Sequence, residues 1–125
     1  KGAGDFQYMK ENDERLFERV LQTSQQWGDS NNMMYVVGAT RAEMLKDIRK
    51  IVPHHFLLVP GVGAQGGSLA EVARHGMNEK CGLLVNASRS VIFAGNDENF
   101  ADAARQEATR IQQEMEGLLE EGGLI

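Results

Sequence analysis

Apolar residues fall into three short continuous runs, separated by segments in which they recur at helical spacing. The runs cover residues 33–39, 56–59 and 82–86 and read M-M-Y-V-V-G-A, F-L-L-V and G-L-L-V-N. None of them alternates apolar with polar residues, and such unbroken runs are typical of parallel strands covered on both faces. The pattern therefore predicts three buried strands.

Helices are predicted before, between and after these strands, because apolar side chains recur there at intervals of three and four residues. The predicted helices cover residues 11–27, 41–51, 69–75 and a long segment from the turn at 95–97 to about residue 121. Thr40 with Glu43 and Ser68 with Glu71 have the spacing of capping boxes at the starts of the second and third helices.

The order of one helix followed by three strand–helix units predicts an α/β fold with a parallel sheet and right-handed crossovers. Three strands do not close an eight-stranded barrel, which usually takes about 250 residues. At 125 residues, the chain is predicted to be a single domain, residues 1–125, equal to about half of such a barrel. It begins at Lys1 without Met, and residues 2–5 resemble the middle of a loop, so we expect a fragment of a longer chain.

The turn after the second strand is rich in glycine. Residues 61–66 read G-V-G-A-Q-G and match the dinucleotide pattern G-x-G-x-x-G between a strand and a helix. Glycines let a backbone approach a phosphate, and the helix after Ser68 offers free N–H groups. Pro60 at the strand end, and Asn86 where an acidic ribose ligand is expected, argue against NAD. The turn favours a single phosphate group over a dinucleotide site or a purely structural turn.

The turn after the third strand reads Ser88-Arg89-Ser90. In barrel enzymes the active site lies at the carboxyl ends of the strands, and phosphate is often held after the last two of them. The charged, planar guanidinium of Arg89 is suited to binding a phosphate. The backbone of Ser88 or Arg89 can donate an N–H, and the side chain of Gln65 can donate its amide. The alternative is that Arg89 pairs with an acidic residue at the rim, an interaction worth little.

Three segments together resemble the last three strands of orotidine 5′-phosphate decarboxylases, in order and spacing. They are residues 36–40 (V-V-G-A-T), 58–67 (L-V-P-G-V-G-A-Q-G-G) and 83–90 (L-L-V-N-A-S-R-S). The resemblance is greater to the subfamily with a P-G-[IV]-G-A-Q-x-G turn, whose loop after the fifth strand resembles residues 4–7. It implies the C-terminal half of a TIM barrel that converts orotidine 5′-monophosphate to UMP in pyrimidine biosynthesis without a cofactor.

The resemblance also implies roles for individual residues. Gln65 would reach the phosphate and base, and Arg89 with the backbone of Ser88 would hold the phosphate. Pro60 would line the pyrimidine pocket, and Gly63 belongs to the same binding turn. The family's Lys/Asp array, D-x-K-x-x-D, is absent from the sequence. No catalytic residue is therefore expected in this chain, and the N-terminal half of the barrel would supply that chemistry. A homodimer is also implied.

Composition narrows the choice of partner and location. The net charge of −5 disfavours nucleic acid, whose binders concentrate Lys and Arg. The apolar runs are far shorter than the roughly 20 residues that cross a bilayer, and the single Cys81 favours a reducing, cytoplasmic compartment. The histidines lack metal-ligand spacing, so no metal is expected. Another phosphate- or dinucleotide-binding α/β enzyme, and an inactive half-barrel fragment, are the other interpretations.

Overall fold

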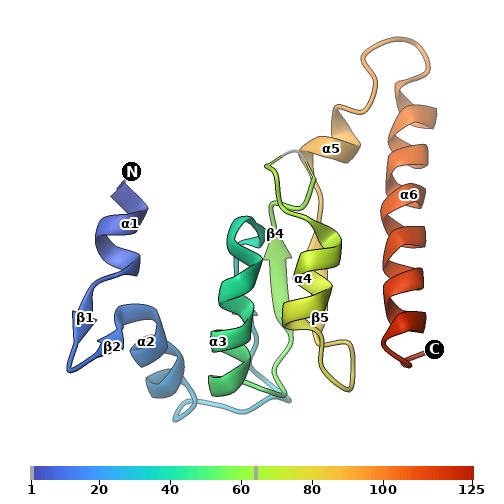
Figure 1. Cartoon of the computed structure of the whole chain (residues 1–125). Helices are drawn as coiled ribbons and strands as arrows, with labels where there is room; N and C mark the ends of the chain where they lie inside the picture. Colours follow the sequence, from blue (N-terminus) through green and yellow to red (C-terminus); the bar gives the residue numbers. More distant parts are fainter. Residues whose placement is uncertain (1, 64) are drawn as a thin grey trace.

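The structure, a computed structural model, describes residues 2–63 and 65–125 (Figure 1). Lys1, at the start of the chain, and Ala64, in the glycine-rich turn, lie outside the described residues. The elements in chain order are α1 (Gly2–Gln7), β1 (Lys10–Glu11), β2 (Glu14–Arg15), α2 (Leu16–Ser24), β3 (Tyr35–Val36), the 3-10 helix η1 (Ala39–Met44), α3 (Leu45–Ile51), β4 (Leu57–Pro60), α4 (Leu69–Gly76), β5 (Leu83–Asn86), α5 (Arg89–Ile92) and α6 (Phe100–Glu121).

The central sheet has the order β3-β4-β5, and both pairs of neighbours are parallel. Leu57 of β4 is in register with Tyr35 on one side and Leu83 on the other. Each strand therefore ends at the same edge of the sheet, where Pro60 pairs with Asn86. The predicted parallel α/β fold with three strands is confirmed, although β3 is shorter than the apolar run that predicts it.

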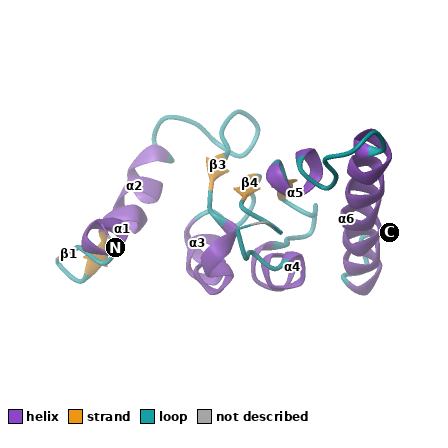
Figure 2. Cartoon of the chain, turned by 90° about the horizontal axis from the view of Figure 1, so that it is seen from above, coloured by secondary structure: helices purple, strands orange, loops and turns teal. Residues whose placement is uncertain are grey.

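Helices α3 and α4 lie side by side on one face of this sheet, and the core fills the space between (Figure 2). Leu57 and Val59 are alternate residues of β4, so their side chains point to the same face of the sheet, and both are fully buried in that core. Leu45 of α3 and Val72 of α4 are also fully buried. Partly buried residues of α6 extend the core on the β5 side: Ile111, Met115 and Leu118. The predicted apolar faces of α3 and α4 therefore contribute to the core, and part of the face of α6 packs against it.

The other face of the sheet is apolar but exposed among the described residues. Val36 is 69% exposed, Leu84 49% and Met34 46%. The prediction that the strands are covered on both faces is wrong for this chain taken by itself. In a barrel this face is the interior, which side chains of all strands fill together. The unbroken apolar runs thus suit a closed barrel of which this sheet is a part.

The N-terminal region differs from its prediction. Residues 2–7, expected in a loop, form α1, and the helix predicted from residue 11 begins only at Leu16. A tight antiparallel hairpin of β1 and β2 precedes it. Asn12 and Asp13 form its turn with φ of 52° and 66°, and Asn and Asp adopt this left-handed conformation more readily than most residues. Polar turn chemistry therefore outweighs helix propensity here.

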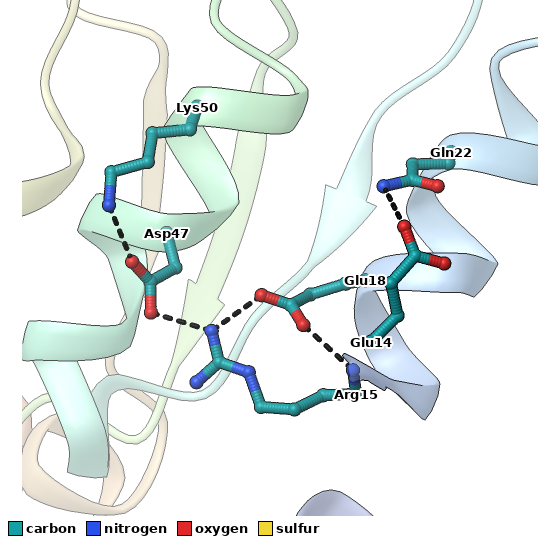
Figure 3. Close-up of polar contacts among 6 residues, drawn as sticks. All are labelled: Glu14, Arg15, Glu18, Gln22, Asp47 and Lys50. Atoms are coloured by element: carbon teal, nitrogen blue, oxygen red, sulfur yellow. Dashed lines mark hydrogen bonds and ion pairs between the residues drawn. The ribbon is translucent and has the colours of Figure 1, made fainter. Parts of the chain in front are cut away.

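Arg15 links this N-terminal region to helix α3, which packs on the sheet (Figure 3). Its Nη2 lies 2.6 Å from a carboxylate oxygen of Glu18 in α2 and 2.6 Å from one of Asp47 in α3. Lys50 donates to the second oxygen of Asp47 at 2.9 Å. The Arg15 guanidinium, with Lys50, lowers the pKa of Asp47, and Arg15 lowers the pKa of Glu18. The cluster is an ionic link between α2 and α3.

Of the two predicted capping boxes, one forms in part and the other does not form. The Ser68 hydroxyl accepts a hydrogen bond from the backbone N–H of Glu71 at 3.3 Å, so Ser68 is an N-cap, although the Glu71 carboxylate pairs with Arg74 and His75. The capping box of Thr40 and Glu43 is wrong. The backbone there enters η1 after Gly38 without a side-chain cap. Across the described residues, no helix is long and apolar enough to cross a membrane.

Candidate phosphate site at the carboxyl edge of the sheet

The glycine-rich turn leaves β4 at Pro60 and closes on itself before α4. Gly61, Gly63 and Gly66 have φ of 93°, 80° and 86°, a range that side chains rarely adopt. The N–H of Gly66 donates to the carbonyl of Gly63 at 2.8 Å, and that of Gly63 to the carbonyl of Gly67 at 3.0 Å. Because the N–H of Gly63 is used inside the turn, Gly63 can shape a phosphate site but has no free backbone donor for it.

Close packing requires glycine at position 67. A Cβ at this position would lie 2.5 Å from the Cβ of Ala39 and 2.6 Å from the carbonyl oxygen of Gly61. Real side chains do not approach so closely, so the turn can rest against the start of η1 only with glycine here. Part of the G-x-G-x-x-G signal thus reflects close packing of two loops, which a pattern match alone does not separate from ligand binding.

The second turn follows β5 and contains a short helix that sequence reasoning missed. Ser88 precedes α5, and its carbonyl accepts from the N–H of Ile92 at 2.8 Å. The Ser88 hydroxyl donates to the side-chain oxygen of Asn86 at 2.9 Å. The sequence signal for this helix is a serine followed by the apolar residues Val91 and Ile92. A single helical turn is too short to show helical periodicity. Arg89 is therefore the first residue of α5.

The predicted donors are exposed at this edge. Arg89 and Gln65 both have exposed side chains, and Arg89 forms no ion pair with any acidic residue that the structure describes. The alternative of a rim ion pair for Arg89 is thus not seen. Pro60 is half-buried at the end of β4, next to Asn86 of β5. The guanidinium of Arg89 is accordingly available to an anion.

The two turns touch each other. A Cβ built on Gly63 would lie 3.2 Å from the Oγ of Ser90 and 3.3 Å from its Cβ. The contact joins the turn after β4 to the first turn of α5. It places the loops that carry Gln65 and Arg89 beside one another, as expected for parallel neighbours whose carboxyl ends share one edge. Sequence reasoning assigned no role to Ser90.

Other candidate chemistry lies elsewhere. Within residues 2–63 and 65–125, no three His, Cys, Asp or Glu side chains are grouped as metal ligands. His54 and His55 precede β4, at the opposite end of the sheet from the two turns. His54 lies 2.9 Å from a Glu79 oxygen. His55 packs on the Tyr35 ring at 5.3 Å, and burial lowers its pKa. Neither histidine is near the candidate site.

Comparison with known proteins gives the chain its relatives. No family model matches it. A protein named orotidine 5′-phosphate decarboxylase from Parabacteroides distasonis is 60% identical over the whole chain, and one of the same name from Porphyromonas gingivalis is 62% identical over the whole chain. Over its whole length, this chain is therefore similar to proteins named orotidine 5′-phosphate decarboxylase. It spans 45–46% of the length of these two relatives.

Solved structures of a UMP synthase and of an OMP decarboxylase show the same similarity. A Leishmania donovani UMP synthase matches with a TM-score of 0.73 and 33% identity, over 90% of this chain and 25% of that protein. A Leishmania donovani OMP decarboxylase matches with a TM-score of 0.71 and 30% identity, over 90% and 44%. These neighbours are TIM barrels, and the predicted half-barrel fold class is confirmed.

Proposed function

We propose that the protein containing this chain decarboxylates orotidine 5′-monophosphate to UMP, and that this chain supplies the turns that bind the substrate phosphate. The observation that carries the proposal is the contact between the two turns, at Gly63 and Ser90. It brings the exposed side chains of Gln65 and Arg89 to one edge of the sheet. The identity of 60% to a decarboxylase over the full chain supports the same activity.

The chemistry of a phosphate dianion suits these donors. Arg89 stays charged and presents several N–H groups in a plane, which matches two phosphate oxygens. Gln65 adds a neutral amide donor, and the backbone before Arg89 adds an N–H. With three donors from two loops, the phosphate would be bound only when both turns keep their relative position. Pro60, at the base of the first turn, would face the pyrimidine.

The reaction itself needs groups that this chain lacks. Loss of CO2 leaves a carbanion that must be stabilised electrostatically and protonated. The resemblance assigns that work to a Lys/Asp array, which we expect in the N-terminal half of the barrel. Remote phosphate binding still contributes, because binding energy far from the reacting carbon can be used to stabilise the transition state. Homodimer formation and a cytoplasmic location stay predictions from the sequence.

The test is Arg89→Ala in the full-length protein, with Arg105→Ala on the exposed surface of α6 as the matched control. Affinity for UMP and for uridine is measured by calorimetry. A lost hydrogen bond to a charged group corresponds to about 10- to 100-fold weaker UMP binding, while uridine, without a phosphate, should bind unchanged. Equal affinity of the Arg89 variant and the control for UMP would contradict the proposal.

The dinucleotide alternative is separated by thermal unfolding. A ligand that binds the folded state raises the melting temperature, so UMP is expected to stabilise the full-length protein and NADH is not. The feature of the sequence that favours NADH is the match of residues 61–66 to G-x-G-x-x-G. Stabilisation by NADH alone would replace the proposed activity with a dinucleotide-dependent one.

A further inference from the structure

One polar atom at the contact between the two turns has no hydrogen-bond partner. The hydroxyl oxygen of Ser90 is buried, and nothing in the part of the chain that the structure describes bonds to it. It lies against Gly63, at 3.2 Å from where a Cβ would stand. Leaving a buried hydroxyl unpaired is destabilising, so such groups call for an explanation.

Packing explains the size of this side chain but not its hydroxyl. The Ser90 Cβ also lies against Gly63, at 3.3 Å from the same Cβ position, so alanine would keep most of the contact between the turns. Cysteine would fill the same space with a more apolar group. Because either residue would avoid the unpaired hydroxyl, the structural role alone does not account for serine at position 90.

The position of Ser90 indicates what the hydroxyl can bind. Ser90 follows Arg89 directly and contacts Gly63 in the turn that carries Gln65, so it lies where the loops of the two predicted phosphate donors meet. A serine side chain moves among three staggered positions about one bond. The hydroxyl can therefore leave Gly63 and donate to a ligand at the edge without any change in the backbone.

We infer that Ser90 is a further phosphate-binding residue, whose hydroxyl has no partner among the described residues and hydrogen-bonds a phosphate oxygen of the bound nucleotide. The inference rests on the proposed function, since it concerns the same site. It also gives Gly63 a role, because a side chain there would occupy the space in which the Ser90 hydroxyl lies and turns. Gly63 is thus required both for its φ of 80° and for that space.

The experiment uses three serine variants of the full-length protein: Ser90→Ala, Ser90→Cys and, as the matched control, Ser30→Ala in the exposed loop after α2. Calorimetry measures binding of UMP and of uridine, and thermal unfolding without ligand measures stability. Both Ser90 variants are expected to bind UMP about 10- to 100-fold more weakly and uridine as the control does. Without ligand, Ser90→Ala should melt at the same temperature as the control or higher.

Each other outcome has a distinct meaning. Unchanged UMP affinity of Ser90→Ala, with Arg89→Ala weakened, overturns this inference and leaves the proposed function standing. Unchanged UMP affinity of both the Ser90 and the Arg89 variants refutes the phosphate site as a whole. Equal weakening of UMP and uridine by Ser90→Ala, with normal binding by Ser90→Cys, shows a packing role and also overturns the inference.

Discussion

Replacing Arg49 should destabilise the fold more than a single buried contact would suggest. Arg49 lies in the last turn of α3, at the end of the sheet opposite the two turns, and its guanidinium donates hydrogen bonds to backbone carbonyls. Nε donates to Gly76 at 2.6 Å, Nη1 to His55 at 2.6 Å and to Val52 at 3.2 Å, and Nη2 to Gly82 at 2.8 Å. One side chain thus joins the end of α3, the end of α4 and the approaches to β4 and β5.

The magnitude follows from opposing effects. A hydrogen bond with a charged donor is worth about 1.5–3 kcal/mol, so four of them would sum to about 6–12 kcal/mol. Burial works against the charge and lowers the pKa of Arg49, and bonds that share one group are not additive. We expect Arg49→Ala to cost about 3–5 kcal/mol, because it leaves several carbonyl acceptors without this donor, at about 1–3 kcal/mol for each one that is buried. Natural domains have about 5–15 kcal/mol in total.

Urea unfolding of the full-length protein, followed by circular dichroism, measures this loss. Arg49→Lys keeps the charge but has a single ammonium group, which cannot reach Gly76, His55 and Gly82 together, so it should recover less than half of the loss. Arg105→Ala on α6 removes an exposed arginine whose partner is Asp102, and should cost below about 1 kcal/mol. A loss for Arg49→Ala no greater than that for Arg105→Ala would contradict this prediction, because the carbonyls would then be satisfied without the guanidinium.

Three further predictions concern the ionic link, the exposed sheet face and one turn. Arg15 lowers the pKa of Asp47 below its ordinary 3.8, so the link stabilises the fold above that pH and is lost as pH falls through the folded pKa. Asp47→Asn should cost about 0.5–1 kcal/mol at pH 7, and a cost that persists in urea titrations at pH 2 would contradict this. Val36→Lys in the full-length protein should cost about 2 kcal/mol or more in the same assay, because we expect the other half of the barrel to cover Val36; a neutral effect would mean that this face meets solvent. Gly82→Ala should lower the free energy of unfolding in urea more than Gly123→Ala does. Both glycines have positive φ, but a Cβ on Gly82 would lie 2.6 Å from Asn78, while one on Gly123 meets nothing within 4 Å. Equal losses of stability would exclude a steric cause.

Local patterns in the sequence predicted the elements that depend on local physics. Leu57 and Val59 lie in an unbroken apolar run, and both are fully buried in β4. Ser68 lies three residues before Glu71 and caps α4. These features need only near neighbours along the chain, so spacing and residue type were enough. The start of α2 was missed because Asn12 and Asp13 form a tight turn whose conformation competes with a helix.

Patterns along the chain were enough to predict the parallel α/β class, the two loops at the carboxyl edge and the candidate donors Gln65 and Arg89. The folded arrangement was needed to show that Ser90 contacts Gly63, that the N–H of Gly63 is already used, and that Val36 is exposed among the described residues. These features depend on residues that strand register and helix packing bring together, and no spacing along the chain encodes such contacts.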